Sequence, residues 1–283
     1  MEKARHPVAL LCEAVGVSRA GYYEWKQREL SERKKEDVAI VTNMRAIQRE
    51  HLHRYGSPRM TKELKARGVH VNKKRVERLM RRHGVGAQYP RPFKRTTDSN
   101  HREPIAPNLL EQSFDGYQRD QVWVGDITYV WTAEGWIYLA VLLDLYSRRV
   151  VGWAAGRTLS RQLALDALKM AIKNRNPPRG LIHHTDRGCQ YASHDYQKVL
   201  RDHGMRCSMS GKGNCYDNAV AESFFATLKK ELVHRAVFFS RSQAYRALFN
   251  FIEGYYNPKR RHSAAGYLSP IDFEHSQKQK LAA

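Results

Sequence analysis

The sequence predicts an α/β protein in which a mixed five-stranded sheet flanked by helices follows an all-helical N-terminal region. Three observations predict this architecture. Helical periodicity runs to residue 86, a proline-rich polar stretch then interrupts it, and β-rich runs alternate with helical ones from residue 119 onward. We therefore expect two N-terminal helical segments, a linker, a mixed α/β core and a helical, basic C-terminal segment, at residues 1–35, 36–86, 87–118, 119–235 and 236–283.

The charge of the chain is strongly positive. It has 49 Lys and Arg against 28 Asp and Glu, a net charge of +21 and an isoelectric point near 10. Residues 1–118 carry 25 basic and 14 acidic residues, and residues 119–283 carry 24 and 14, so both halves are basic. Such a surface attracts polyanions, which favours a nucleic-acid partner. A soluble basic protein without such a partner is the alternative.

The cysteines and the apolar runs exclude several classes of protein. Cys12, Cys189, Cys207 and Cys215 form neither a C-x-x-C pair nor a disulfide framework, so a zinc finger is not expected. The longest apolar run, "IYLAVLLDL", contains Asp144 and is too short to cross a bilayer. We expect a reduced, cytoplasmic protein with no membrane partner.

Residues 7–27 have the outline of a helix-turn-helix. Pro7 suits a first helical turn, Gly16 marks a turn, and Ser18 is a good N-cap for the next helix. Arg19 and Lys26 on that second helix are candidate DNA contacts, although Gly21 within it is unfavourable for a helix.

A second helix-turn-helix outline follows in residues 34–84. We expect a long helix, a turn over "YGSPRM", a short helix capped by Thr61 and a basic helix capped by Asn72. A basic helix face is usually only solvated, but two such outlines in one basic region favour DNA contact. The candidate residues are Lys73, Lys74, Arg75, Arg78, Arg81 and Arg82.

Residues 119–235 alternate strands and helices in a specific order. Strands are expected at 121–131, 136–147, 148–156, 180–186 and 206–210, and helices at 160–175, 193–204 and 218–233. This β-β-β-α-β-α-β-α order is that of a ribonuclease-H-like fold.

Three acids stand at informative places in that order. Asp126 lies inside the first strand, Asp186 ends the fourth, and Glu222 follows it by 35 intervening residues in the first turns of a helix. A carboxylate in a buried strand is costly unless it is paired or bound to a metal. Carboxylates that converge at one sheet edge suit Mg²⁺ or Mn²⁺, and two such ions about 4 Å apart catalyse phosphodiester chemistry. The alternative is that each acid is a cap or an ion-pair partner.

Neighbouring residues fit such a site. Lys229 lies seven positions after Glu222, about 20° round the same helix face, and is expected to be exposed there and to hold a DNA phosphate. Lys212 lies in a glycine-containing loop that either closes over a substrate or is simply mobile. His183 and His184 either order the metal loop or are plain strand residues, and we favour the second interpretation.

Three blocks of the core carry a resemblance to a known family. "WVGDITY", "HHTDRGCQY" and "SGKGNCYDNAVAESFFATLKKE" resemble those of bacterial insertion-sequence transposases with a retroviral-integrase-like catalytic core. The chain is most similar to the second-frame product of the IS-three group, whose pattern of two aspartates, 35 residues and a glutamate falls on Asp126, Asp186 and Glu222. The basic "NPKRRHS", with Lys259, Arg260 and Arg261, lies in a stretch that resembles the closing segment of that group.

The resemblance implies a metal-dependent enzyme that nicks transposon ends and transfers the freed 3′-hydroxyl to another phosphodiester. It implies double-stranded DNA and further copies of the chain as partners, a possible upstream-frame partner from the same element, and no covalent enzyme–DNA intermediate. Tyr129, Tyr191 and Tyr216 are therefore not needed as nucleophiles. The alternatives are a DNA-binding regulator or inactive remnant, and a ribonuclease-H-like nuclease without strand transfer.

Overall fold

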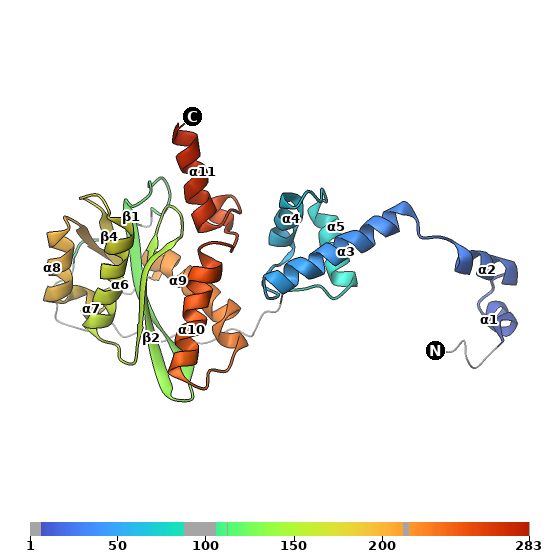
Figure 1. Cartoon of the computed structure of the whole chain (residues 1–283), viewed down its shortest axis with the longest axis horizontal. Helices are drawn as coiled ribbons and strands as arrows, with labels where there is room; N and C mark the ends of the chain where they lie inside the picture. The colour runs from blue at the N-terminus through green and yellow to red at the C-terminus, as the bar shows by residue number, and fades with distance from the viewer. Residues whose placement is uncertain (1–6, 88–105, 112, 212–214, 283) are drawn as a thin grey trace. The chain divides into compact units, whose positions relative to one another are not determined.

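The computed structural model describes residues 7–87, 106–111, 113–211 and 215–282. The chain divides into two compact units, Met1–Gln88 and Tyr89–Ala283 (Figure 1). Each unit is described by itself below.

The first unit begins with two short helices. They are α1 (Val8–Ala14) and α2 (Arg19–Gln27). The Ser18 side chain accepts a hydrogen bond from the Gly21 backbone N–H at 3.0 Å, as an N-cap does, and Gly16 has a positive φ of 68° in the turn. The helix-turn-helix outline predicted for this segment is present.

Three further helices form the core of the first unit. They are α3 (Glu32–Glu50), α4 (Ser57–Ala66) and α5 (Lys73–Arg82). Met44, Ile47, Leu64 and Leu79 are fully buried in their shared core. Asn72 caps α5 as predicted, accepting from the Arg75 N–H at 2.8 Å.

The predicted start of α4 is wrong. The helix begins at Ser57 rather than after a Thr61 cap, and Pro58 occupies its first turn. Proline is favourable there because its missing N–H has no helical partner to lose. The Thr61 hydroxyl instead donates to the Ser57 carbonyl at 2.7 Å from inside the helix.

A five-stranded mixed sheet organises the second unit. Its order is β3-β2-β1-β4-β5. β1 pairs antiparallel with β2, which pairs antiparallel with β3, while β4 is parallel to both β1 and β5. The strands are β1 (Val122–Thr132), β2 (Gly135–Asp144), β3 (Val150–Gly156), β4 (Ile182–Thr185) and β5 (Arg206–Met209).

Helices cover both faces of this sheet, and the two hydrophobic cores follow the alternation of side chains along the strands. Val124 and Val141 face the core formed with α9 (Ala219–Glu231) and α10 (Arg241–Phe251). Trp123 and Leu142 face the core formed with α6 (Arg161–Arg175), α7 (Cys189–Ala192) and α8 (His194–Asp202). Figure 1 shows these two helical layers on opposite sides of the strands.

The contact between β3 and α6 depends on a glycine. A Cβ on Gly152 would overlap the Ala167 carbonyl oxygen and the Ala171 backbone. The absence of a side chain therefore lets the helix lie directly against the strand.

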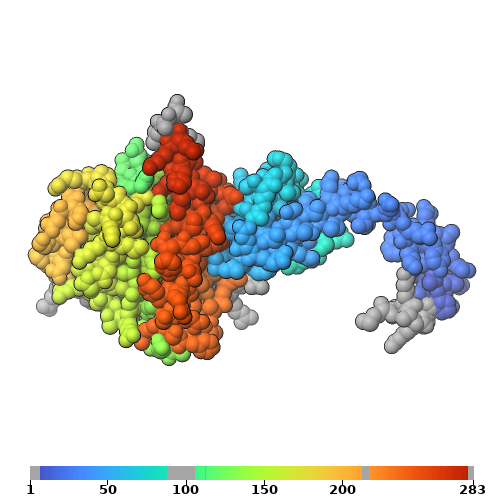
Figure 2. All heavy atoms as spheres, in the orientation of Figure 1, coloured from blue at the N-terminus to red at the C-terminus, as the bar shows by residue number. Residues whose placement is uncertain are grey.

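Residues 236–283, predicted as a separate C-terminal segment, belong to this same unit. Leu248, Phe251 and Tyr256 are buried in the core that also holds Val124 and Val141. In the space-filling view, α10 and the segment after it (orange to red) cover this side of the unit (Figure 2). The remaining elements are η2 (Cys215–Asn218), η3 (Val233–Arg235), the π-helical turn η4 (Ile252–Tyr256), η5 (Ser263–Ala265) and α11 (Pro270–Ala282).

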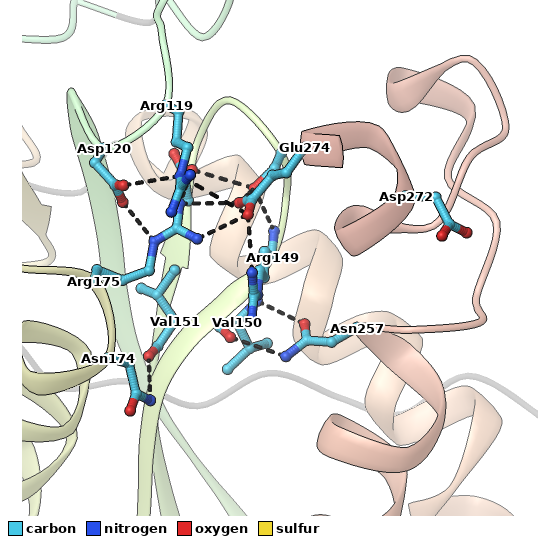
Figure 3. A network of polar contacts seen from close by, with 12 residues as sticks. Arg119, Asp120, Arg149, Val150, Val151, Asn174, Arg175, Asn257, Asp272 and Glu274 are labelled. Carbon is cyan, nitrogen blue, oxygen red and sulfur yellow. Dashed lines mark hydrogen bonds and ion pairs between the residues drawn. The ribbon is translucent and has the colours of Figure 1, made fainter. Parts of the chain in front are cut away.

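A buried ion-pair network fixes α11 to the sheet (Figure 3). The Arg175 side chain is 3% exposed and binds Glu274 of α11 at 2.8 Å, Asp120 at 2.8 Å and Asp144 at 3.3 Å. Arg149, the residue before β3, donates a hydrogen bond to the Glu274 carboxylate at 2.9 Å. One arginine thereby links the C-terminal end of α6 to the segment before β1, the end of β2 and the last helix.

No helix within the described ranges is long and apolar enough to span a membrane. Cys12, Cys189 and Cys207 carry free thiols, in agreement with the lack of a disulfide framework in the sequence.

Candidate active site

The parallel pairing of β1 with β4 brings the two predicted aspartates together. Gly125 is the register partner of Thr185, so Asp126 and Asp186 follow at the same level, where the pairing ends. A Cβ on Gly125 would meet the His183 ring at 3.1 Å, which shows how closely the strands approach. The Asp186 carboxylate accepts the Gly188 N–H at 2.9 Å, and this bond shapes the loop after β4.

Glu222 enters the same region from α9. It lies exposed in the first turn of the helix, where the helix dipole favours a carboxylate. Phe224, Phe225 and Leu228 hold α9 on the face of the sheet to which Asp126 belongs by its alternation with Val124. Asn218 occupies the N-cap position of α9, although its side chain makes no capping hydrogen bond with the helix.

Electrostatic coupling links the three acids. Burial raises the pKa of the Asp126 carboxyl well above its ordinary value, and the negative charges of Asp186 and Glu222 raise it further. The positive charge of Lys229 acts in the opposite direction. The charges of Asp186 and Glu222 therefore both reach the Asp126 carboxyl and oppose its ionisation.

Lys229 lies farther along α9, and its ammonium group is 5.2 Å from the centre of the Tyr129 ring. Its side chain is half-buried rather than fully exposed as predicted, because the Tyr129 ring lies against it. The lysine thus stands between the acids and an aromatic side chain of β1.

The donor set suits a hard divalent cation. Carboxylate oxygens are the ligands that Mg²⁺ and Mn²⁺ prefer, and a cation relieves the mutual repulsion that raises the Asp126 pKa. Within the part of the chain that the structure describes, no three His, Cys, Asp or Glu side chains are already arranged to hold one ion. A two-ion site does not require this arrangement, since different pairs of carboxylates hold each ion.

His183 and His184 connect β4 to its neighbours. The His183 Nε2 lies 2.6 Å from the Tyr196 hydroxyl, and the His184 Nδ1 lies 2.8 Å from the Ser208 hydroxyl. Burial lowers the pKa of each imidazole to about 4, so both rings are neutral near pH 7. These contacts support their interpretation as structural strand residues.

Tyr191 lies buried beside the acids. Burial raises the pKa of its hydroxyl well above the ordinary value, and the charges of Asp126 and Asp186 raise it further. Its hydroxyl has no hydrogen-bond partner among the described residues. A phenol that holds its proton this firmly is a poor nucleophile.

The predicted basic face of α5 divides into paired and unpaired residues. Arg75 binds Asp37 at 2.8 Å and Glu36 at 2.9 Å, and Arg78 binds Asp37 at 3.0 Å. Lys73 lies 3.4 Å from Glu77. Arg75 is partly buried and holds α5 to α3, so its guanidinium is already engaged, and its contact with DNA stays a prediction.

Other arginines and lysines of the first unit remain available. Arg81, Arg82 and Lys74 are exposed, and no ion pair or hydrogen bond engages their side chains among the described residues. Arg19 and Lys26 are exposed on α2. Arg45 and Arg49 of α3, which were not among the predicted DNA contacts, line a hollow of about 470 Å³ with His53 and His83.

The C-terminal basic residues also differ from expectation. Arg260 is a correction: its side chain is 4% exposed and binds the Glu231 carboxylate at 2.7 Å, so it joins α9 to the segment after η4 rather than contacting DNA. Arg261 donates to the Tyr267 carbonyl at 2.9 Å. Lys259 is exposed, as a DNA contact would require, and Lys212 lies outside the described residues.

Comparison with known proteins assigns the chain to a family. Residues 116–215 and 203–270 match integrase core domain models, and residues 35–93 match an HTH-like domain model. The chain is 45% identical over 279 residues to the transposase InsF of insertion sequence IS3A from Escherichia coli, covering 96% of this chain and 95% of that protein. The chain belongs to this family of insertion-sequence transposases.

A second curated relative and two solved structures are also similar to the chain. A 31 kDa protein of insertion element IS600 from Shigella sonnei is 42% identical over 96% of this chain and all of that protein. Among solved structures, the simian T-cell lymphotropic virus intasome has a TM-score of 0.47 at 18% identity, covering 76% of this chain and 70% of that one. The magnesium-bound HTLV-2 integrase core scores 0.44 at 17% identity, covering 56% and 99%.

Membership of the transposase family confirms the predicted resemblance, the integrase-type fold and a function in DNA transposition. The enzyme is a polynucleotidyl transferase of the class that uses two aspartates and a glutamate. An integrase core of this kind implies dependence on a divalent metal ion, and the HTH-like domain implies DNA binding.

Proposed function

We propose that this transposase cleaves one strand at each transposon end and joins the freed 3′-hydroxyl to a second phosphodiester, with Asp126, Asp186 and Glu222 as its catalytic carboxylates. The observation that carries the proposal is the register of β1 with β4, which places Asp126 and Asp186 side by side where the pairing ends, with Glu222 on the helix packed against the same face of the sheet. The partners are double-stranded DNA, further copies of the chain and the upstream-frame product of the same element.

The three carboxylates would hold two Mg²⁺ or Mn²⁺ ions. When bound, such ions activate the attacking oxygen and stabilise the leaving oxygen of an in-line displacement. Asp126 and Asp186 lie side by side at a rigid strand edge, while Glu222 approaches from a helix, so the two strand ligands are fixed and the helix supplies the third.

Lys229 would hold the DNA phosphate that neighbours the scissile phosphate. The positive charge of Lys229 already acts on the Asp126 carboxyl. Its contact with the Tyr129 ring restrains the flexible lysine side chain. A restrained cation loses less conformational entropy when it binds a phosphate than a freely rotating one. The unpaired cations of the first unit, Arg81, Arg82 and Lys74, would bind the duplex away from the cleavage site.

The test is cleavage and strand transfer on labelled transposon-end DNA with Mg²⁺ or Mn²⁺. Asp126→Asn, Asp186→Asn and Glu222→Gln should each abolish both reactions and leave duplex binding intact. Asp166→Asn is a matched control, because Asp166 is an exposed acid on α6 that bonds only to Gln162 within its own helix.

Retained cleavage in any of the three variants would remove that residue from the site. Cleavage without strand transfer by the wild type would favour a nuclease. Binding without cleavage by the chain alone, restored by fusion to the upstream-frame product, would show that this partner is required.

A further inference from the structure

Two tryptophans are exposed at the end of the β1–β2 hairpin. Trp131 is 57% exposed and Trp136 is 42% exposed, although both lie in strands of the central sheet. They are register partners, and their rings meet edge to face with centroids 4.7 Å apart. Large exposed aromatic side chains that lie together on a folded protein mark binding surfaces more often than isolated ones do.

A continuous row of side chains joins this pair to the active site. Trp136 meets the Tyr129 ring edge to face at 5.0 Å, and the Lys229 ammonium lies 5.2 Å from that ring. Lys229 in turn acts electrostatically on the Asp126 carboxylate. The row therefore begins at the acids and ends at an open indole ring.

The length and chemistry of this row match a DNA strand. Trp131 follows Asp126 by five residues of extended strand, roughly 17 Å. This odd spacing puts their side chains on opposite faces of β1, so the row passes round the strand edge where the pairing with β4 has ended. A cation near the catalytic end suits a phosphate, while stacked aromatic rings at the far end suit a base. The net charge of +21 favours this anionic occupant over an apolar peptide.

We propose that Trp131, supported by Trp136, forms a stacking platform for an unpaired base of the DNA strand that enters the active site. A base within a duplex is already stacked on its neighbours, so the platform takes a nucleotide that is single-stranded beside the cleavage site. That this DNA strand leads into the active site rests on the proposed function. The test measures DNA binding and requires no cleavage, so the two can fail separately.

A purely structural role is the competing account, because cross-strand aromatic pairs stabilise hairpins. That role requires contact between the two rings, and it gives no reason for the larger exposed fraction of Trp131. Trp131→Phe keeps an aromatic face for both roles but removes the Trp131 indole emission, so DNA-dependent quenching of that emission distinguishes a base platform from a hairpin contact.

The test measures binding of the full chain, without divalent ions, to a blunt duplex and to the same duplex with a single-stranded extension. Trp131→Ala should weaken binding of the extended DNA roughly 5- to 150-fold and leave blunt-duplex binding unchanged. Trp131→Phe should restore most of this affinity. Phe239→Ala should have no effect, because Phe239 is 71% exposed near the hairpin but outside this row.

Tryptophan fluorescence gives a second measurement that does not depend on an alanine variant. The extended DNA should quench wild-type emission more than the blunt duplex does, and this difference should shrink in Trp131→Phe. Equal losses of affinity for both DNAs, or equal quenching by both, would overturn the proposal. Concentration-dependent dimers that Trp131→Ala converts to monomers in sedimentation would overturn it too, by identifying a second copy of the chain as the occupant.

Discussion

Gly125 of β1 and Thr185 of β4 are register partners in the only parallel contact that β1 makes within the described sheet. The residues that follow them, Asp126 and Asp186, leave this contact side by side. The relationship places two acids that lie 60 positions apart in the sequence at one edge, and it is the geometric basis of the proposed site.

Lys229→Ala should reduce DNA affinity and cleavage with little loss of stability. Its contact with Tyr129 is worth only about 0.5–1 kcal/mol, whereas loss of one phosphate contact lowers the salt dependence of binding by roughly 0.9 in log–log slope. Fluorescence anisotropy at several salt concentrations measures this slope. Lys230→Ala, at the neighbouring and more exposed position, is the control. An unchanged slope together with a large fall in melting temperature would assign Lys229 a structural role.

The paired and unpaired cations of α5 should respond differently to substitution. Arg81→Ala combined with Arg82→Ala should lower both DNA affinity and its salt slope and leave the melting temperature unchanged, because neither side chain is engaged in the described structure. Arg75→Ala should destabilise the first unit by about 1 kcal/mol, because it removes the contacts with Asp37 and Glu36. The reverse pattern would show that α5 binds DNA through the arginine that the structure pairs with α3.

The stability of the second unit should depend on pH through Asp144. Burial, followed by the negative charge of Asp120, raises the pKa of this carboxyl to about 7. The folded state therefore holds a proton that the unfolded chain releases near pH 4, so this stabilising contribution is present at low pH and is lost as pH rises through 7.

Asp144→Asn isolates that contribution. The free energy of unfolding of the wild type should fall, relative to that of the variant, by an amount on the order of a few kcal/mol between pH 5 and pH 8. Urea titrations at both pH values measure it. The comparison with the variant removes the opposite effect of His183 and His184, whose lowered pKa values of about 4 favour the folded state as pH rises. Parallel pH curves for both proteins would contradict the assignment.

Gly152→Ala should destabilise the second unit by roughly 1–3 kcal/mol or more, because the added methyl group overlaps backbone atoms of α6 that have no room to move. Gly254→Ala is the matched control, since no atom lies within 4 Å of its added Cβ. Thermal unfolding compares the two. Equal melting temperatures would show that α6 shifts readily away from β3.

Local features of this fold follow from short-range sequence patterns. A run of β-branched and aromatic residues indicates β1, and the Ser18 and Asn72 caps follow from side chains that reach a backbone N–H three residues away. The spacing of Asp126, Asp186 and Glu222 identifies the acids before their positions are known. The wrong start of α4 has the same local origin, because both Pro58 with its first-turn preference and Thr61 with its capping preference indicate a helix start.

Long-range pairing was not predictable in this way. Arg75 and Asp37 are 38 positions apart, Arg260 and Glu231 are 29 apart, and Arg175 and Glu274 are 99 apart. The sequence alone makes each of these arginines a candidate DNA contact or a candidate ion-pair partner. Only the folded structure shows which of them pair with an acid. The exposed Trp131 and Trp136 pair is of the same kind, because aromatic residues in a strand normally indicate a buried core.

The central claim is that Asp126, Asp186 and Glu222 together bind the catalytic ions. Manganese binding by electron paramagnetic resonance, measured on the full chain with transposon-end DNA, tests it most directly. The wild type should bind two Mn²⁺ ions per chain, and Asp126→Asn, Asp186→Asn and Glu222→Gln should each lose at least one, while Asp166→Asn binds as the wild type does. Unchanged Mn²⁺ binding in the three variants would contradict the account.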